Sequence, residues 1–276
     1  MTFTPGKRRF KVDYATAGAL LALGSLAPAT ASASTSQPIV ESPNYAQVII
    51  GDAPIMYWRL GERTGNVATD SSGNSRDAWY AHRPHLGLNG AIVNDPDTAV
   101  GFDGQDDLAG WQPVFSHSGP FSVEAWVGTR RDVAYQTFFS TRGLCPGACV
   151  DYSFDIKLEH TSGYGIRVDV GDGSRWLVTE TFPFAWATRT YYHVVAVASG
   201  TGLTLFVDGA EIGGSSYAQT SPLLFDHTHK VQIGVANATG GAESEWFGGL
   251  VDEVAVYDYA LTAEQVADHF AAGIGP

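Results

Sequence analysis

Pairs of carboxylate side chains are the groups in this sequence that could hydrolyse a glycosidic bond. Cleavage of a glycosidic bond needs two carboxyl groups, about 5–5.5 Å apart for retention of configuration and farther apart for inversion. Asp155 and Glu159 would lie on one face of a strand, but Lys157 lies on the same face between them. Asp252 and Asp258 would share a face with two valines between them. Neither spacing fits the pair that hydrolysis requires.

Other catalytic motifs are absent from the sequence. It contains neither Gly-x-Ser-x-Gly, which carries a serine nucleophile, nor His-Glu-x-x-His, which holds a catalytic zinc. The eight histidines are scattered, and only His227 and His229 form a close pair. On a strand these two rings would share a face and could hold a metal, but we expect surface histidines. The sequence therefore predicts a protein without enzymatic activity.

Oxygen-bearing side chains in the loops suggest a structural calcium ion. Calcium takes about six to eight hard oxygen ligands, and the spacing here does not match an EF-hand loop. The candidate ligands are Asp70 and Asn74 in one loop, Asp103 in a turn with Asp106 and Asp107, and Asp252 near the last strand. The alternative is that Asp70 and Asp103 cap turns through Asx hydrogen bonds. Both interpretations stay open.

Aromatic side chains near loops could bind a sugar by stacking. Trp79 and Tyr80 follow the first polar loop, and Trp176 lies beside a Gly-Asp-Gly turn. We select these three as candidate ligand-binding residues, with partial burial in the core as the competing role. Trp58 and Trp126 lie within strand motifs and are expected in the core.

Two cysteines, Cys145 and Cys149, are separated by Pro-Gly-Ala. An exported chain meets an oxidising compartment, which favours a disulfide between them. Zinc is the alternative, but two thiols without nearby histidines make a poor cage. A ring this short would stiffen one turn and add little global stability.

The start of the chain has the features of an export signal. A basic segment from Lys7 to Lys11 precedes an apolar run from Ala15 to Ala27, and Ala31-Ser32-Ala33 fits a cleavage site. The run is too short for a comfortable membrane span. We expect residues 1–33 to be a signal peptide, 34–44 a flexible linker and 45–276 one domain. The product would be a secreted, extracellular protein without a membrane span after signal removal.

The net charge of −13 argues against one class of partner. A chain this acidic should repel phosphate backbones, so we expect no binding to nucleic acid.

Alternating apolar residues and frequent turns predict an all-β fold. Residues 121–127 alternate with a period of two, typical of a strand with one buried face, and residues 192–198 are apolar on both faces, as in a central strand. Further strands are expected at 55–60, 137–140, 152–159, 164–170, 175–181, 203–207, 231–235 and 250–257. Strands without intervening helices favour a two-sheet sandwich or barrel.

Helices are expected only near the ends of this domain. Thr262-Ala263-Glu264-Gln265 fits a capping box, and Gly273 is a plausible stop. Residues 45–50 could be helical or extended.

Six motifs in order resemble the laminin-G-like, concanavalin A-like jelly rolls of secreted bacterial proteins. They are Tyr57-Trp58-Arg59-Leu60-Gly61-Glu62 followed by Asp70-Ser71-Ser72-Gly73-Asn74, the Phe-Asp-Gly segment at 99–104, and the segments 121–127, 192–197, 203–209 and 248–257. The resemblance covers residues 45–273. It implies an antiparallel two-sheet jelly-roll sandwich with one short C-terminal helix, a role in binding glycans or proteins, and a structural calcium in the loops.

These observations together predict a secreted, non-catalytic module that binds carbohydrate, with a polysaccharide or glycoprotein as its partner. Two alternatives stay open. One is a cell-surface domain for protein binding or adhesion, and the other is a glycoside hydrolase-like enzyme with an unrecognised site.

Overall fold

A computed structural model of the chain describes residues 44–142, 152–161, 163–218, 221–226, 230–237 and 242–275. All of them belong to one compact unit, residues 42–276. The expected signal peptide, the expected linker up to residue 43, the cysteines Cys145 and Cys149, and the pair His227 and His229 lie outside the described residues.

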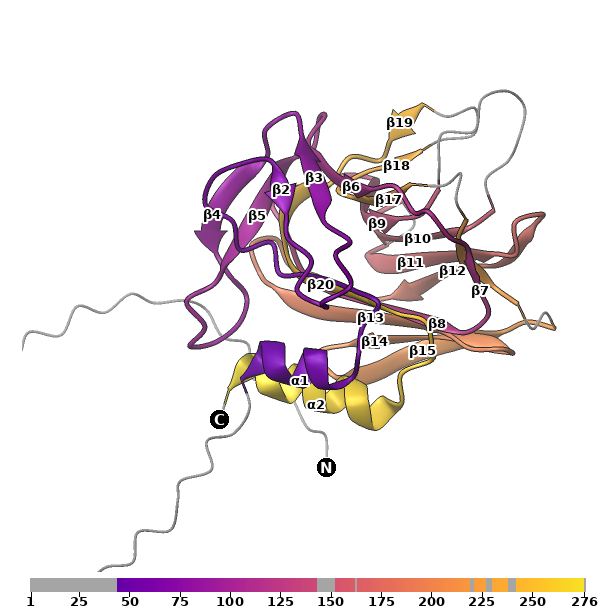
Figure 1. Ribbon diagram of the computed structural model, residues 1–276. Coiled ribbons are helices and arrows are strands. Elements are labelled where there is room, and N and C mark those ends of the chain that lie inside the picture. The colour runs from indigo at the N-terminus through magenta and orange to yellow at the C-terminus, as the bar shows by residue number, and fades with distance from the viewer. Residues whose placement is uncertain are drawn as a thin grey trace, which may run out of the picture. The chain divides into compact units, whose positions relative to one another are not determined.

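Two large antiparallel sheets form the body of this unit (Figure 1). Sheet A contains β1 (Met56–Trp58), β4 (His85–Asn89), β5 (Thr98–Asp103), β8 (Phe121–Thr129), β13 (Tyr192–Ala198), β14 (Gly202–Val207), β15 (Ala210–Ser216) and β20 (Gly248–Tyr257). Sheet B contains β2 (Val67–Ala68), β3 (Ala78–Ala81), β6 (Leu108–Trp111), β9 (Tyr135–Ser140), β10 (Phe154–Glu159), β11 (Gly165–Gly171), β12 (Trp176–Pro183) and β17 (Val231–Ile233). Two small sheets pair β7 (His117–Ser118) with β16 (Leu223–Phe225) and β18 (Ala236–Asn237) with β19 (Glu243–Ser244).

The strand order explains the burial of individual strands. Sheet A runs β15-β14-β13-β8-β20-β5-β4, with β1 paired to β20, and sheet B runs β12-β11-β10-β9-β17-β6-β3-β2. Strand β13 lies inside sheet A and is buried from His193 to Ala198, so the prediction of a central strand is confirmed. The predicted all-β sandwich of two antiparallel sheets is also confirmed.

The main core lies between the two sheets. Alternate side chains of β8 and β10, such as Val123 and Val127 from one sheet and Ile156 and Leu158 from the other, belong to one buried cluster. Burial of this apolar surface is the dominant stabilisation of such a sandwich.

Two helices, α1 (Tyr45–Gly51) and α2 (Ala263–Ile274), cover the outer face of sheet A (Figure 1). Trp126 of β8 packs against Tyr45 of α1 and Phe270 of α2. Every residue of β8 is therefore buried. The prediction that residues 121–127 have only one buried face is wrong, because the second face meets helices instead of water.

The helix ends follow local sequence signals. Thr262 and Gln265 form the predicted capping box of α2, and Asn44 forms a second one with Gln47 that begins α1. Asn44 was expected to be part of the linker. Gly273 does not end α2, which continues to Ile274. Its role is steric, since a Cβ at Gly273 would lie 2.3 Å from Cζ2 of Trp126.

A β-bulge interrupts β20 beside Asp252. The pairing with β8 shifts between Asp252 and Ala255, and Glu253 has a φ of 52°. The bulge breaks the alternation of side chains, so the expectation that Asp252 shares a face with Val254 and Val256 is wrong. It also directs the Glu253 carboxylate to Arg59, 2.7 Å from Nη2.

Candidate functional site

No helix covers the outer face of sheet B within the described residues (Figure 1). This face carries polar side chains such as those of Gln232, Asp155 and Asp169. On β10, Phe154, Ile156 and Leu158 belong to the core, so the intervening Asp155 and Lys157 lie on the outer side. The sequence therefore placed Asp155, Lys157 and Glu159 correctly on one face.

The strand register aligns one residue from each of seven strands of sheet B, β2 excepted, in a row across this face, which we call the outer row. Directly paired residues share a face, and their neighbours along the strands lie in the core, except for the exposed Glu180 beside Thr179. The outer row consists of Trp79, Gly110, Gln232, Ser140, Asp155, Asp169 and Thr179. At about 4.8 Å per strand, it spans about 24 Å from Trp79 to Asp169.

Charged side chains surround Lys157 at one end of the outer row. Lys157 Nζ lies 2.7 Å from Glu245 Oε2, 3.1 Å from Asp155 Oδ1 and 3.4 Å from Asp169 Oδ2. Arg142 Nη1 lies 3.2 Å from Asp155 Oδ2, and Arg167 Nε lies 2.9 Å from Asp169 Oδ1. The lysine that separates Asp155 from Glu159 in sequence thus pairs with three carboxylates.

The shifted pKa values follow from this packing. Burial raises the pKa of Asp169 to about 7, and the adjacent Asp155 carboxylate adds to the effect against the opposing pull of Lys157 and Arg167. Burial alone would lower the pKa of Lys157. The carboxylates of Asp155, Glu245 and Asp169 outweigh it and raise that pKa.

These residues surround an open hollow of about 280 Å³, which we call the charged hollow. This volume is just below the range of about 300–1,000 Å³ typical of small-molecule pockets. The hollow is lined by Tyr135, Arg142, Lys157, Arg167, Asp169, Trp176 and Glu245. Trp176, one of the predicted ligand-binding residues, is half-buried there, and the Arg142 guanidinium carbon lies 5.5 Å from its ring centre.

A second hollow of about 180 Å³, the tryptophan hollow, lies around the other end of the outer row. It is lined by Trp79, Ala81, His82, Leu108, Gly110, Lys230, Gln232 and Glu243. The Trp79 side chain is 37% exposed. Its ring lies over Gly110, because a Cβ there would be 3.2 Å from Trp79 Cζ2. The absence of a side chain at Gly110 leaves room for the Trp79 ring at this place.

Tyr80, the third predicted ligand-binding residue, points to the opposite side. It is 7% exposed, belongs to the core between the sheets, and donates its hydroxyl hydrogen bond to Glu62 at 2.7 Å. Its neighbour Trp79 alternates with it along β3, so only one of the two rings can reach the outer face.

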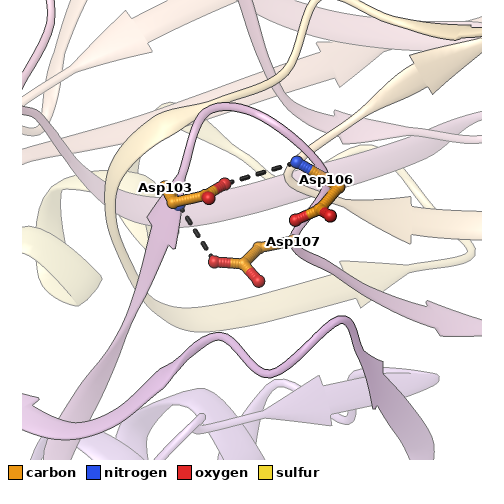
Figure 2. A group of neighbouring side chains, drawn as sticks. All are labelled: Asp103, Asp106 and Asp107. Atoms are coloured by element: carbon orange, nitrogen blue, oxygen red, sulfur yellow. Dashed lines mark hydrogen bonds between the residues drawn. The ribbon is translucent and has the colours of Figure 1, made fainter.

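The turn between β5 and β6 brings Asp103, Asp106 and Asp107 together (Figure 2). One carboxylate oxygen of each lies within 4.8 Å of the others. Asp103 Oδ1 accepts hydrogen bonds from the Gln105 and Asp106 N–H groups at 2.8 and 3.3 Å, so the Asx bonds considered as the alternative are present. Burial, followed by repulsion from Asp103, raises the pKa of Asp107.

Asp70 and Asn74 fix a different turn. Asp70 Oδ1 accepts from the N–H groups of Tyr57 and Ser72 at 3.0 and 2.9 Å, and Oδ2 accepts from the Ser72 hydroxyl at 2.8 Å. The Asn74 amide donates to the Ile55 carbonyl at 3.2 Å. These bonds hold the turn against the start of β1.

Asp252 is buried beside Ala91, whose N–H donates to its Oδ2 at 2.7 Å. Its Oδ1 has no hydrogen-bond partner among the described residues. Burial, with the neighbouring Glu253 carboxylate adding to it, raises the pKa of Asp252 well above its usual value. Within the described residues, the only close group of three potential ligand side chains is the one at Asp103, and it includes neither Asp70 nor Asp252. Calcium binding stays a prediction.

Sequence reasoning missed several residues of the charged hollow. Arg167 and Asp169 alternate along β11, a signal that was readable, but Arg142 follows β9 and Glu245 follows β19. Arg142 reaches Asp155 and Glu245 reaches Lys157 through the tertiary arrangement of these segments, which a single sequence does not reveal.

Within the described residues, no helix has the length and apolarity needed to cross a membrane.

Solved structures with the same fold include several sugar-binding and toxin domains. Domain 4 of an extracellular arabinanase from Geobacillus stearothermophilus, in complex with arabinotriose, is 19% identical over 79% of this chain and 98% of that domain, with a TM-score of 0.56. The ligand-binding domain of botulinum neurotoxin serotype D, in complex with N-acetylneuraminic acid, is 10% identical over 82% of this chain, with a TM-score of 0.59. The binding domain of Paraclostridial mosquitocidal protein 1 is 12% identical over 80% of this chain, with a TM-score of 0.60.

The chain spans about half of each toxin structure, 52% in both cases. At these identities the likeness shows the fold. No curated protein sequence matches the chain. A family model described as the concanavalin A-like lectin/glucanases superfamily matches residues 102–267. This match covers more than half of the sequence, and with the two-sheet sandwich it shows that the chain belongs to the concanavalin A-like lectin/glucanases superfamily.

Proposed function

We propose that this chain is an exported, non-catalytic module that binds a carbohydrate along the outer row of sheet B. The two neighbours solved with arabinotriose and with N-acetylneuraminic acid support a sugar ligand on this fold. The export signal expected at residues 1–33 supports an extracellular role.

The observation that carries the proposal is the placement of the half-exposed Trp79 ring next to Gly110 in a hollow that polar side chains also line. Apolar faces of sugar rings stack on such indoles, while hydroxyl groups bond to neighbouring polar side chains. Gln232 and Glu243 line the same hollow and supply hydrogen-bonding groups. Trp176 offers a second aromatic surface at the far end of the outer row.

The ion pairs around Lys157 support binding rather than hydrolysis. Two-carboxylate hydrolysis requires one carboxyl group to donate a proton and the other to act as nucleophile or base. Here Asp155 and Asp169 both pair with Lys157, and each also pairs with an arginine. A carboxylate held in this way is less available for the chemistry.

The proposal is tested with the full chain on an array of plant, bacterial and animal glycans, followed by calorimetry with the best ligand. We expect Trp79→Ala and Trp176→Ala each to weaken binding about tenfold, which corresponds to about 1.4 kcal/mol. The control is Tyr164→Ala, which removes an exposed aromatic ring that lines neither hollow.

Two outcomes contradict the proposal. Silence across the whole array would favour a protein partner instead. Release of smaller sugars from a bound ligand during prolonged incubation would show a hydrolase.

A structural calcium at the β5–β6 turn is the second part of the proposal. Asp103, Asp106 and Asp107 supply the hard oxygen ligands that calcium prefers, and a cation would relieve the repulsion that raises the pKa of Asp107. Calcium should raise the melting temperature of the wild type relative to a chelator, and Asp106→Asn should abolish the increase. An identical midpoint with calcium and with chelator would contradict this part.

A further inference from the structure

The charged hollow concentrates cations in an acidic chain. Three of the 16 lysine and arginine residues line it, whereas only two carboxylates, Asp169 and Glu245, do so. Asp155 lies below them with a fully buried side chain. The surface presented to a ligand therefore has more cationic than anionic groups, although the whole chain has a net charge of −13.

The cations of the hollow differ in how far their donors are used. Lys157 Nζ lies within ion-pair distance of three carboxylates and donates a hydrogen bond to one of them, Glu245, at 2.7 Å. Arg167 uses only Nε, which donates to Asp169 at 2.9 and 3.1 Å. Its Nη1 and Nη2 groups contact no acceptor among the described residues, and its side chain is 31% exposed. A planar pair of N–H donors is therefore available at the surface of the hollow.

The rest of the lining suits a sugar that bears this anionic group. Tyr135 and Trp176 provide aromatic surface. Glu245 Oε2 accepts from Thr137 and Lys157 at 2.9 and 2.7 Å, whereas Oε1 contacts no donor among the described residues and could accept from a sugar hydroxyl.

We propose that the charged hollow binds an anionic sugar residue, whose carboxylate or sulfate group pairs with the terminal N–H groups of Arg167. Planar bidentate pairing with oxyanions is characteristic of arginine. The inference rests on the proposed carbohydrate function and narrows its ligand to a chemical class. The tryptophan hollow would hold a neighbouring part of the same saccharide.

Proton uptake by the hollow should strengthen this binding. Asp169 faces Asp155 and Lys157 on β10 and Arg167 on its own strand. The uncharged Thr179 faces it from β12. The other titratable or charged residues around the hollow are Arg142, Glu245 and Tyr135. Its pKa of about 7 means that a fall from pH 8 to pH 6 removes one negative charge beside Arg167. A sugar carboxylate stays ionised over this range, so its affinity should rise as the pH falls.

Calorimetry on the full chain tests the inference with matched saccharides. One arm compares trisaccharides of galacturonate, glucuronate and mannuronate with their methyl esters, and the other compares sulfated galactan trisaccharides with their desulfated forms. We expect at least tenfold tighter binding of one anionic series than of its neutral counterpart. The series that binds identifies carboxylate or sulfate as the recognised group.

The variants assign the effect to one side chain. Arg167→Gln should remove the tenfold preference, and Arg167→Lys should retain part of it because the charge stays while the planar donor pair is lost. Arg63→Gln is the matched control, since Arg63 is exposed and lines neither hollow. If Arg167→Gln does not fold, the wild type alone can test whether binding depends on the anionic group. Raising NaCl from 0.05 to 0.5 M should then weaken binding of the anionic series and leave binding of the neutral series unchanged.

The two levels of the proposal fail in different ways. Equal affinity for anionic and neutral partners, or an unchanged preference in Arg167→Gln, would overturn the anionic-sugar inference and leave carbohydrate binding standing. Absence of binding to every saccharide, in the array and in solution, would overturn both.

Discussion

The outer faces of the two sheets use ionisable side chains in opposite ways. On sheet A, Glu124 of β8 lies beneath α2, with Oε2 2.8 Å from Nδ1 of His269. The other ring nitrogen of His269 lies 2.8 Å from Asp52, the C-cap of α1. On sheet B, the Lys157 side chain of β10 also points to the outer face of its sheet, but it borders an open hollow.

The covered face is a closed electrostatic unit. Burial raises the pKa of Glu124, but His269 and His193 outweigh it and lower that pKa to about 2. Burial lowers the pKa of His269, but Glu124 and then Asp52 raise it to about 9. The Tyr257 hydroxyl also donates to Glu124 at 3.2 Å. His269 bridges the two carboxylates, and these contacts connect both helices to the sheet.

The open face retains donors that the protein does not use. Because Arg167 keeps free N–H groups and Glu245 a free oxygen among the described residues, the ion pairs there can reorganise around a ligand. The comparison teaches that a charged network stabilises the fold where helices cover it and can recognise a ligand where it borders solvent. Three changes test this contrast, from the largest expected effect to the smallest.

Glu124→Leu should cause the largest loss of stability. It leaves the buried His269 without its main counter-charge, so we expect the free energy of unfolding to fall by about 3–5 kcal/mol. Urea denaturation measures this loss. The control is Glu180→Leu, which removes an exposed carboxylate at the edge of sheet B and should change the value by less than about 0.5 kcal/mol. A loss below about 1 kcal/mol for Glu124→Leu would contradict the closed unit.

The pH dependence of stability should carry the signature of His269. Its folded-state pKa of about 9 exceeds the usual 6.5, so its contribution is complete below pH 6.5 and is lost as the pH rises through 9. We expect unfolding to become easier by about 2–3 kcal/mol between these values. Urea titrations at several pH values measure the slope. His269→Gln should flatten it, and a slope unchanged in that variant would contradict the assignment.

Lys157→Met should have a smaller effect because Arg142 and Arg167 still pair with Asp155 and Asp169. The variant leaves Asp155, Asp169 and Glu245 without their shared cation, and we expect a loss of about 1–2 kcal/mol at pH 8. Burial and the adjacent Asp155 carboxylate raise the pKa of Asp169 to about 7, so the loss should shrink toward pH 5 as Asp169 takes up a proton. A loss as large at pH 5 as at pH 8 would indicate a packing defect rather than a charge effect.

The sequence predicted the strands well but not what covers them. Segments 121–127 and 154–159 alternate in a similar way and both are buried along their length, but helices cover the outer side of the first, whereas charged side chains such as Arg142 and Glu245 pack over the second. Alternation reports the direction of side chains and carries no information about the next layer. The C-terminal helix was readable from Thr262 and Gln265, whereas its position over Trp126 depends on tertiary packing.

The candidate site was predictable only in part. Trp79 and Trp176 were selected from their places near loops, and both line hollows on the outer face. Tyr80 was selected with them, although strand alternation alone would have separated it from Trp79. Arg142 reaches Asp155 from the segment after β9 and Glu245 reaches Lys157 from the segment after β19, so their contribution follows from tertiary arrangement and not from local spacing.

Backbone amide shifts during titration with the best glycan test the central claim most directly. For a uniformly ¹⁵N-labelled chain, the account predicts that the largest changes lie along the outer row, at Gly110, Gln232 and Asp169, and at the indole N–H groups of Trp79 and Trp176. Changes confined to α1, α2 or the Asp103–Asp107 turn would place the ligand elsewhere and contradict it.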